Sequence, residues 1–209
     1  MKIYDISMPI TYEMPVYKGR VEKRPIIKNE SNFTTGSVYE SRMDMNLHTG
    51  THVDSPLHMV PEGSTIDKLE LSKVITKCKV FSLISVKEKI TKEDLITKDI
   101  QEDDFILFKT QNSFMDILED EFIYLDKSGA KYLSLIKVKG VGIDSLGIER
   151  NQSGHETHKL LMEAGIVILE GLRLGNIEEG VYNLFAAPIY ILGTEAAPVR
   201  AILTNYNSD

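Results

Sequence analysis

Three of the chain's five histidines stand in one short segment that also holds an aspartate. The run is His48-Thr-Gly-Thr-His52-Val-Asp54-Ser-Pro-Leu-His58. Its glycine and proline hold the donors at fixed spacing, and several nitrogen and oxygen donors on one shaped segment suit a divalent metal ion. The alternative is a loop of histidines hydrogen-bonded to the backbone, which the interposed aspartate disfavours. The segment therefore predicts a metal site.

The residues between the histidines predict a strand end or tight loop for this segment. Thr-Gly-Thr is poor helix material and a proline follows closely, while Gly50 lets the backbone turn so that His48 and His52 face one point. In an extended segment His52 and Asp54 share a face, and the two oxygens of Asp54 could bridge two metals. His58 is either a further ligand or an unligated imidazole that transfers a proton near pH 7.

A second set of donors lies about a hundred residues downstream. His155 and His158 are three apart on a predicted helix, so they lie roughly on one face. His158 falls on the apolar stripe of that helix, where a histidine is more often a core residue than a ligand. Glu170 ends an apolar strand on its buried face, where a carboxylate is costly unless it is paired or metal-bound. A solvent-facing glutamate at a strand end is the alternative.

The elements that must position these donors alternate between strands and helices. Runs rich in Val, Ile, Phe and Tyr predict strands over residues 3–7, 38–47, 78–86, 105–109, 141–144, 166–170, 182–192 and 199–203. Capping boxes at Thr91 and Ser153 and helical spacing over 128–138 predict three helices, the last spanning 155–164 and ending at Gly165. We expect a single mixed α/β domain over residues 1–209.

Composition limits the partners and the compartment. The chain has 209 residues and a net charge of −7, which argues against nucleic acid and anionic membranes as partners and leaves a small-molecule substrate. The one cysteine, Cys78, lies in an apolar run and is expected to be a buried strand residue. Without intrachain disulfides, a signal peptide or an apolar run of about 20 residues, a cytoplasmic location is expected.

The order of these donors resembles the cyclase family of metal-dependent amide hydrolases, which includes bacterial kynurenine formamidase and isatin hydrolase. The family's hallmark is His-x-Gly-Thr/Ala-His-x-Asp-x-Pro-x-His, and residues 48–58 match it at every defined position. The resemblance covers nearly the whole chain, from Tyr4-Asp-Ile-Ser-Met-Pro9 through Val141-Gly-Ile-Asp144-Ser to Ala197-Pro-Val-Arg-Ala201. Each of these other segments is weak evidence for the family by itself, but they occur in the order that the family pattern predicts.

The resemblance implies a role for each donor. The implied metal ligands are His48, His52, Asp54, His158 and Glu170. Asp54 would bridge two metals, His58 would be the unligated acid and base, and His155 would stay outside the ligand set. The implied fold is a mixed α/β domain around a central barrel-like β-sheet of the swivelling β/β/α type, assembled as a homodimer or higher homo-oligomer.

The implied activity is metal-assisted hydrolysis of an amide. Two divalent ions per subunit are expected, Zn²⁺ first and Mn²⁺ second, because histidines with carboxylates suit zinc and oxygen-rich sites also accept manganese. A metal-bound hydroxide would attack the carbonyl while His58 protonates the leaving nitrogen. The leading hypothesis is an arylformamidase that converts N-formylkynurenine to kynurenine and formate. The alternatives are a cyclic-amide hydrolase of the isatin type and a metal carrier or sensor without catalysis.

One segment departs from the family pattern. Formamidases of the family often carry Trp-Pro-Gly-Asp after the opening strand, whereas this chain has Tyr17-Lys18-Gly19-Arg20 and no tryptophan. If this proline-rich segment lines the pocket, Tyr17 replaces an indole, which bears on the substrate more than on the chemistry. The same segment is a candidate for contacts with a partner subunit.

Overall fold

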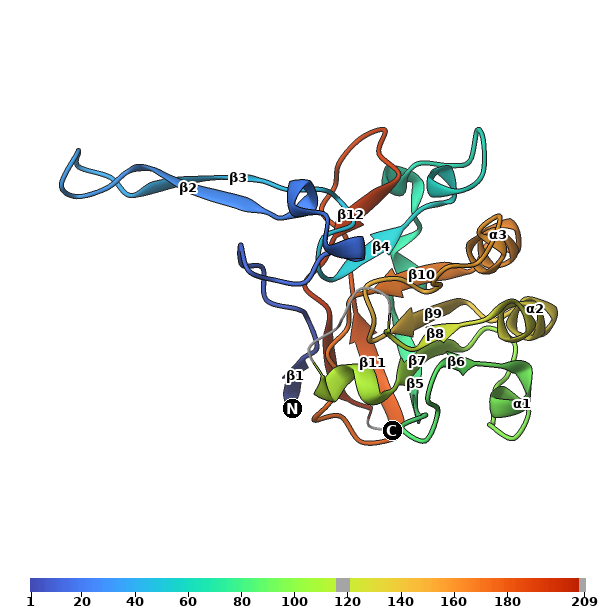
Figure 1. The fold of residues 1–209 in the computed structure, drawn as a ribbon. Helices are drawn as coiled ribbons and strands as arrows, with labels where there is room; N and C mark the ends of the chain where they lie inside the picture. Colours follow the sequence, from blue (N-terminus) through green and yellow to red (C-terminus); the bar gives the residue numbers. More distant parts are fainter. Residues whose placement is uncertain (116–120, 207–209) are drawn as a thin grey trace.

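A nine-stranded sheet that curls into a half-barrel forms the centre of the computed structural model, which describes residues 1–115 and 121–206 (Figure 1). Its order is β1-β13-β11-β5-β7-β9-β10-β4-β12. The bounds are β1 (Ile3–Asp5), β4 (His52–Asp54), β5 (Ile75–Ser82), β7 (Phe105–Lys109), β9 (Gly140–Ile143), β10 (Val167–Glu170), β11 (Gly180–Phe185), β12 (Ala196–Pro198) and β13 (Ile202–Asn205). The expected mixed α/β fold around a barrel-like sheet is confirmed.

The middle of the sheet is parallel and is buried on both faces. Strands β5, β7, β9 and β10 lie next to one another in this order, and each adjacent pair is parallel. The helices α1 (Lys92–Leu95), α2 (Lys127–Ile136) and α3 (Glu156–Glu163) line up on one side of it (Figure 1). Phe108 packs with the helix residue Leu133 in one core, and Leu107 packs with Leu184 in the core on the other face. Burial on both faces explains the nearly continuous apolar run of β7.

Most strands follow the apolar runs, with two departures. The run over 105–109 is β7, whereas only the first part of the run over 182–192 is a strand, since β11 ends at Phe185. The strand expected over 199–203 is wrong: β13 covers Ile202–Asn205, and β12 covers the low-propensity sequence Ala-Ala-Pro ahead of it. Pro198 is tolerated in β12 because this strand forms one edge of the sheet.

All three expected helices form, as α1, α2 and α3, but only one of the two expected capping boxes does. The Thr91 capping box forms with Asp94 at the start of α1. The Ser153 capping box does not form, because α3 begins after His155, a left-handed residue without a side-chain cap. The buried carboxylate of Glu149 accepts a hydrogen bond from the Thr157 amide at 2.9 Å and takes the place of that cap.

A two-stranded arm projects from the body of the molecule. It consists of β2 (Ile26–Ser31) and β3 (Glu40–Asp44), which pair only with each other and are exposed along almost their whole length (Figure 1). A second small sheet pairs β6 (Lys89–Ile90) with β8 (Tyr124–Leu125). Cys78 is buried in β5 as expected, and burial raises the pKa of its thiol to about 12. Among the described residues, no helix is long and apolar enough to cross a bilayer.

Candidate metal centre

The short strand β4 presents the first donors from the interior of the sheet. It pairs antiparallel with both β10 and β12, and this register sets His52 directly opposite Glu170. His52 and Asp54 share a face, as expected from the period of a strand. Gly171, with φ +71°, follows Glu170, and a Cβ there would lie 2.1 Å from the Gly50 carbonyl oxygen. Only glycine fits this close approach of the strand end to the histidine segment.

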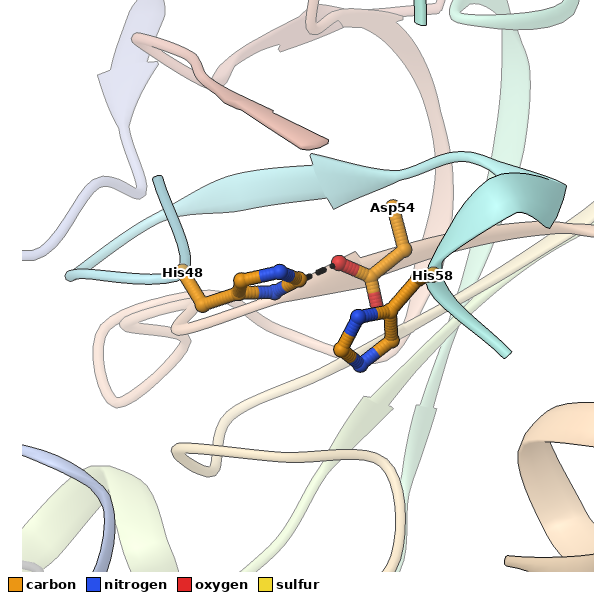
Figure 2. Close-up of side chains that lie close together, drawn as sticks. All are labelled: His48, Asp54 and His58. Atoms are coloured by element: carbon orange, nitrogen blue, oxygen red, sulfur yellow. Dashed lines mark ion pairs between the residues drawn. The ribbon is translucent and has the colours of Figure 1, made fainter. Parts of the chain in front are cut away.

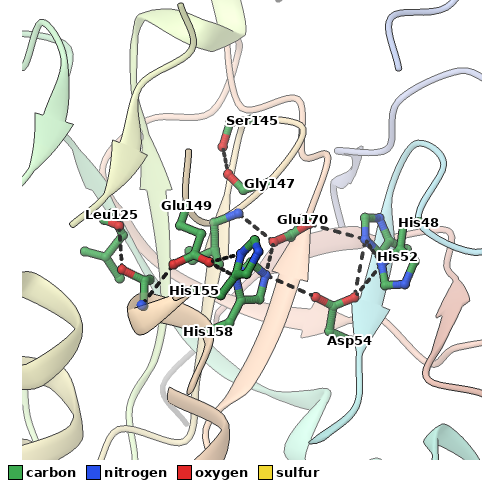
Figure 3. Close-up of polar contacts among 12 residues, drawn as sticks. His48, His52, Asp54, Leu125, Ser145, Gly147, Glu149, His155, His158 and Glu170 are labelled. Carbon is green, nitrogen blue, oxygen red and sulfur yellow. Dashed lines mark hydrogen bonds and ion pairs between the residues drawn. The ribbon is translucent and has the colours of Figure 1, made fainter. Parts of the chain in front are cut away.

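Asp54 lies at the centre of the cluster (Figure 3). Its Oδ1 is 3.0 Å from His48 Nδ1 and 3.4 Å from His52 Nε2, and its Oδ2 is 3.6 Å from His158 Nε2. Both oxygens are buried, and neither accepts a hydrogen bond from any residue that the structure describes. Burial would raise the pKa of Asp54, but the three imidazoles outweigh it and hold the pKa well below its usual range.

Glu170 is buried in the same cluster, which excludes a solvent-facing strand end. Its Oε2 lies 3.3 Å from His52 Nε2 and its Oε1 lies 3.4 Å from His158 Nε2. Oε1 also accepts a hydrogen bond from the Ile148 amide at 2.5 Å. Burial and the Asp54 charge act to raise the pKa of Glu170, but the two imidazoles lower it to about 2. Two buried carboxylates therefore remain ionised side by side.

The histidines are oriented to supply the compensating positive charge. His52 Nδ1 donates to the Gly50 carbonyl at 2.9 Å, which turns Nε2 toward the two carboxylates. Burial would lower the pKa of His52, yet Asp54 and Glu170 raise it to about 10, and the pKa of His158 is raised in the same way. A bound cation would replace these protons, so the donor set fits a divalent metal.

Glu149 is the functional candidate that sequence reasoning missed. Its Oε1 lies 2.7 Å from His155 Nδ1 and 2.9 Å from His158 Nδ1, and its side chain is buried (Figure 3). A carboxylate on the far nitrogen of a ligand histidine fixes the ring orientation and raises its basicity. Glu149 thus directs His158 Nε2 toward Asp54. The one available sequence signal was an acidic residue shortly before a helix.

The remaining two histidines differ in exposure and surroundings. His58 ends a short 3-10 turn (Pro56–His58), and its ring centroid lies 4.1 Å from that of His48 (Figure 2). Its centroid lies 5.5 Å from that of His158. Burial is the main cause that lowers the pKa of His58, which favours the neutral imidazole. His155 is half-exposed and contacts Glu149 rather than the central carboxylates.

Comparison with known proteins decides the family. The family model described as "Putative cyclase" matches residues 4–150, which contain the whole histidine segment. The chain belongs to this cyclase family. Among curated cyclase-family relatives, the kynurenine formamidase of Salinibacter ruber is 31% identical over 206 residues, covering 97% of each chain. That of Erythrobacter litoralis is 32% identical over 205 residues, covering 97% of this chain and 93% of the relative.

Solved structures agree with the cyclase-family fold. A structure described as a "potential metal-dependent hydrolase with cyclase activity" is 48% identical, with a TM-score of 0.91 and 99% coverage of both chains. A "predicted metal-dependent hydrolase" from Bacillus stearothermophilus is 50% identical, with a TM-score of 0.89 and 97% coverage of both chains. Isatin hydrolase A from Labrenzia aggregata, at 22% identity and a TM-score of 0.81 over 97% of this chain and 93% of its own, shares the fold.

Part of the donor set of this cyclase-family chain lines a cavity of about 200 Å³. Its lining includes His48, His58, His158 and Glu170, so an occupant would reach the centre directly. Tyr17 also lines it, which confirms that the segment after the opening strand forms part of the pocket. The neighbouring Met14 and Val16 are buried in a small apolar cluster with Phe122 and hold this segment on the body.

Proposed function

We propose that this chain is a metal-dependent hydrolase of amide bonds, and specifically an arylformamidase that converts N-formylkynurenine to kynurenine and formate. One observation carries the proposal: two buried carboxylates and three imidazoles converge on one point beside a cavity of about 200 Å³. The full-length likeness to proteins named kynurenine formamidase supports this choice of substrate.

The distances support a role for each donor. In this proposal His48, His52, Asp54, His158 and Glu170 would hold the metal ions, and Asp54 would serve both because its two oxygens face different histidines. We propose two divalent ions per subunit, Zn²⁺ first and Mn²⁺ as the alternative. When bound, such ions activate water near neutral pH and polarise an amide carbonyl.

The chain's own residues complete the chemistry. His58 is partly buried beside His48 and, among the described residues, has no hydrogen-bond partner, so its neutral imidazole is free to accept a proton from the attacking water and to pass it to the leaving nitrogen. Glu149 holds the ring of His158 in place, and Tyr17, packed against Met14, Val16 and Phe122, forms part of the pocket wall.

Removal of metal is the direct test. Exhaustive chelation, with metal loss verified by elemental analysis, is expected to abolish hydrolysis of N-formylkynurenine, because no serine or cysteine nucleophile is needed in this scheme. Zn²⁺ or Mn²⁺ is expected to restore the rate, whereas Mg²⁺, which favours all-oxygen sites, serves as the control. Full activity in a verified metal-free sample would contradict the proposal.

A second activity is favoured by one feature of the pocket. Tyr17 lines the cavity where many formamidases carry a tryptophan, and the fold is shared with isatin hydrolase. Hydrolysis of a cyclic amide is therefore the alternative, and assays of N-formylkynurenine and isatin on the same metal-loaded sample separate the two. A carrier or sensor would bind metal and remain inert toward both.

We also propose a single-domain, cytoplasmic homodimer in which the β2–β3 arm contacts the second copy. The arm exposes Ile27, Tyr39 and Met43, and an isolated two-stranded hairpin is marginally stable in water. Sedimentation at micromolar concentration is expected to give twice the chain mass, and Ile27→Ser with Tyr39→Ser should shift it toward the monomer. A wild-type monomer at that concentration would refute the dimer.

A further inference from the structure

One basic side chain lines the cavity beside the metal centre. Among the described residues that form the lining, Lys23 is the one with a permanent positive charge. It ends a 3-10 turn (Val21–Lys23), and its side chain is partly buried. Its ammonium lies 5.8 Å from the centroid of the Tyr17 ring, which lines the same cavity. A cation is therefore available on the wall of the pocket.

The positive charge of Lys23 has no acidic partner in the described part of the chain. Other partly buried lysines do: Lys79 lies 2.8 Å from Asp104, and Lys139 lies 3.1 Å from Asp103. No described carboxylate lies within ion-pairing distance of Lys23, although acidic residues outnumber basic ones in the sequence. A partly desolvated ammonium of this kind gains most from an anion that enters the pocket.

The backbone of Lys23 is fixed to the histidine segment. Thr49, which follows His48, donates its hydroxyl to the Lys23 carbonyl at 3.3 Å, and Pro25 is buried two residues further on. The lysine is thus carried by a tethered turn rather than by a free loop. This tether holds the backbone of Lys23 beside the cavity that His48, His158 and Glu170 also line.

The net charge of the metal-loaded centre also favours an anionic occupant of the pocket. The carboxylates of Asp54, Glu149 and Glu170 balance part of the charge of the two proposed divalent ions, which leaves the centre positive, and Lys23 adds to it. Such a site favours an anionic occupant over a neutral or cationic one.

We propose that the pocket selects amides that also carry a carboxylate within reach of Lys23, and that Lys23 is the residue that binds this carboxylate. The proposal rests on the proposed amide hydrolysis and adds the substrate class. Lys23 does not touch the reacting atoms, so its effect falls on KM while kcat changes little.

A matched set of substrates tests this. The probes are formanilide, 2-carboxyformanilide and 3-carboxyformanilide, assayed on metal-loaded wild type, Lys23→Met and Lys18→Met. Wild type is expected to prefer one carboxylated amide. Lys23→Met should raise its KM about tenfold, the effect of losing one hydrogen bond to a charged group, and leave formanilide unchanged. Lys18→Met is the control, because Lys18 also lies over the Tyr17 ring, at 5.4 Å, but is exposed and outside the lining.

Several outcomes separate this proposal from the proposed function. Equal KM values for neutral and carboxylated amides in wild type, or an unchanged preference in Lys23→Met, would overturn the role of Lys23. Inactivity toward all three amides would contradict amide hydrolysis instead. In that case calorimetric binding of 3-aminobenzoate to the metal-loaded proteins decides: weaker binding in Lys23→Met supports the anion site, and equal binding refutes it.

Discussion

Asp54→Asn is expected to empty both metal positions at once and to abolish hydrolysis. Its two carboxylate oxygens face His48 and His52 on one side and His158 on the other. The amide of asparagine keeps one neutral oxygen and replaces the other with an NH2 group, so it removes the negative charge and can no longer offer an oxygen to both positions. Loss of an outer contact to a metal ligand costs roughly 10–100-fold in affinity, and loss of the shared carboxylate should cost more. Elemental analysis of the purified variant measures the loss directly.

The effect of Asp54→Asn must be distinguished from misfolding. At about 100 times the dissociation constant a bound metal stabilises the folded state by about 2.7 kcal/mol. For a chain of this length that raises Tm by about 5–10 °C. Wild type should show this shift on adding Zn²⁺, and Asp54→Asn should not. Asp67→Asn is the matched control, since Asp67 accepts hydrogen bonds from Thr65 and Gly193 and does not line the cavity. A metal-loaded Asp54→Asn protein would refute the bridging role.

His58→Ala is expected to keep its metal and to lose roughly 10²–10⁴-fold in kcat, the range for loss of a general acid or base. The imidazole of His58 lies beside the ring of His48 (Figure 2) and near that of His158, but the residue belongs to the 3-10 turn that follows β4 and not to β4 itself. Because its removal leaves a gap in the cavity wall, added free imidazole should restore part of the rate. The measurements are kcat with and without imidazole and the metal content.

The measurement of metal content decides between two roles for His58, proton transfer and metal binding. Donor atoms of His48, Asp54 and His58 all lie within 4.8 Å of one another, so His58 also satisfies the spacing of a ligand. If His58→Ala loses one equivalent of metal, the residue is a ligand and another group must move the proton. Retained metal together with imidazole rescue would establish the acid and base role.

The sequence predicts those site residues whose relative positions depend only on the backbone conformation of one short segment. Within one segment, strand periodicity places His52 and Asp54 on one face, and Gly50 provides the left-handed turn before them. The structure brings His158 and Glu170 to the same point, as the family resemblance implied. That meeting depends on the β4–β10 pairing, which no local pattern in the sequence specifies.

The residues that sequence reasoning missed act through contacts between distant segments. Glu149 stands in a loop, and its effect arises only because α3 begins beside it and presents His155 and His158 to the same carboxylate. Strand β2 was also missed, since Lys28, Asn29 and Glu30 are exposed polar residues paired only with β3. Neither burial nor periodicity marks such residues before the fold is known.

The leading segment that carries Tyr17 and Lys23 has an evolutionary consequence. The proposed metal ligands belong to strands β4 and β10, to the helix α3 and to the turn before β4, whereas this part of the pocket wall comes from the first 25 residues. Selection can therefore rewrite the substrate range of such a protein by changing the leading segment alone. The residues that carry the chemistry and the residues that set the substrate specificity therefore lie in different segments, and the two segments can diverge at different rates.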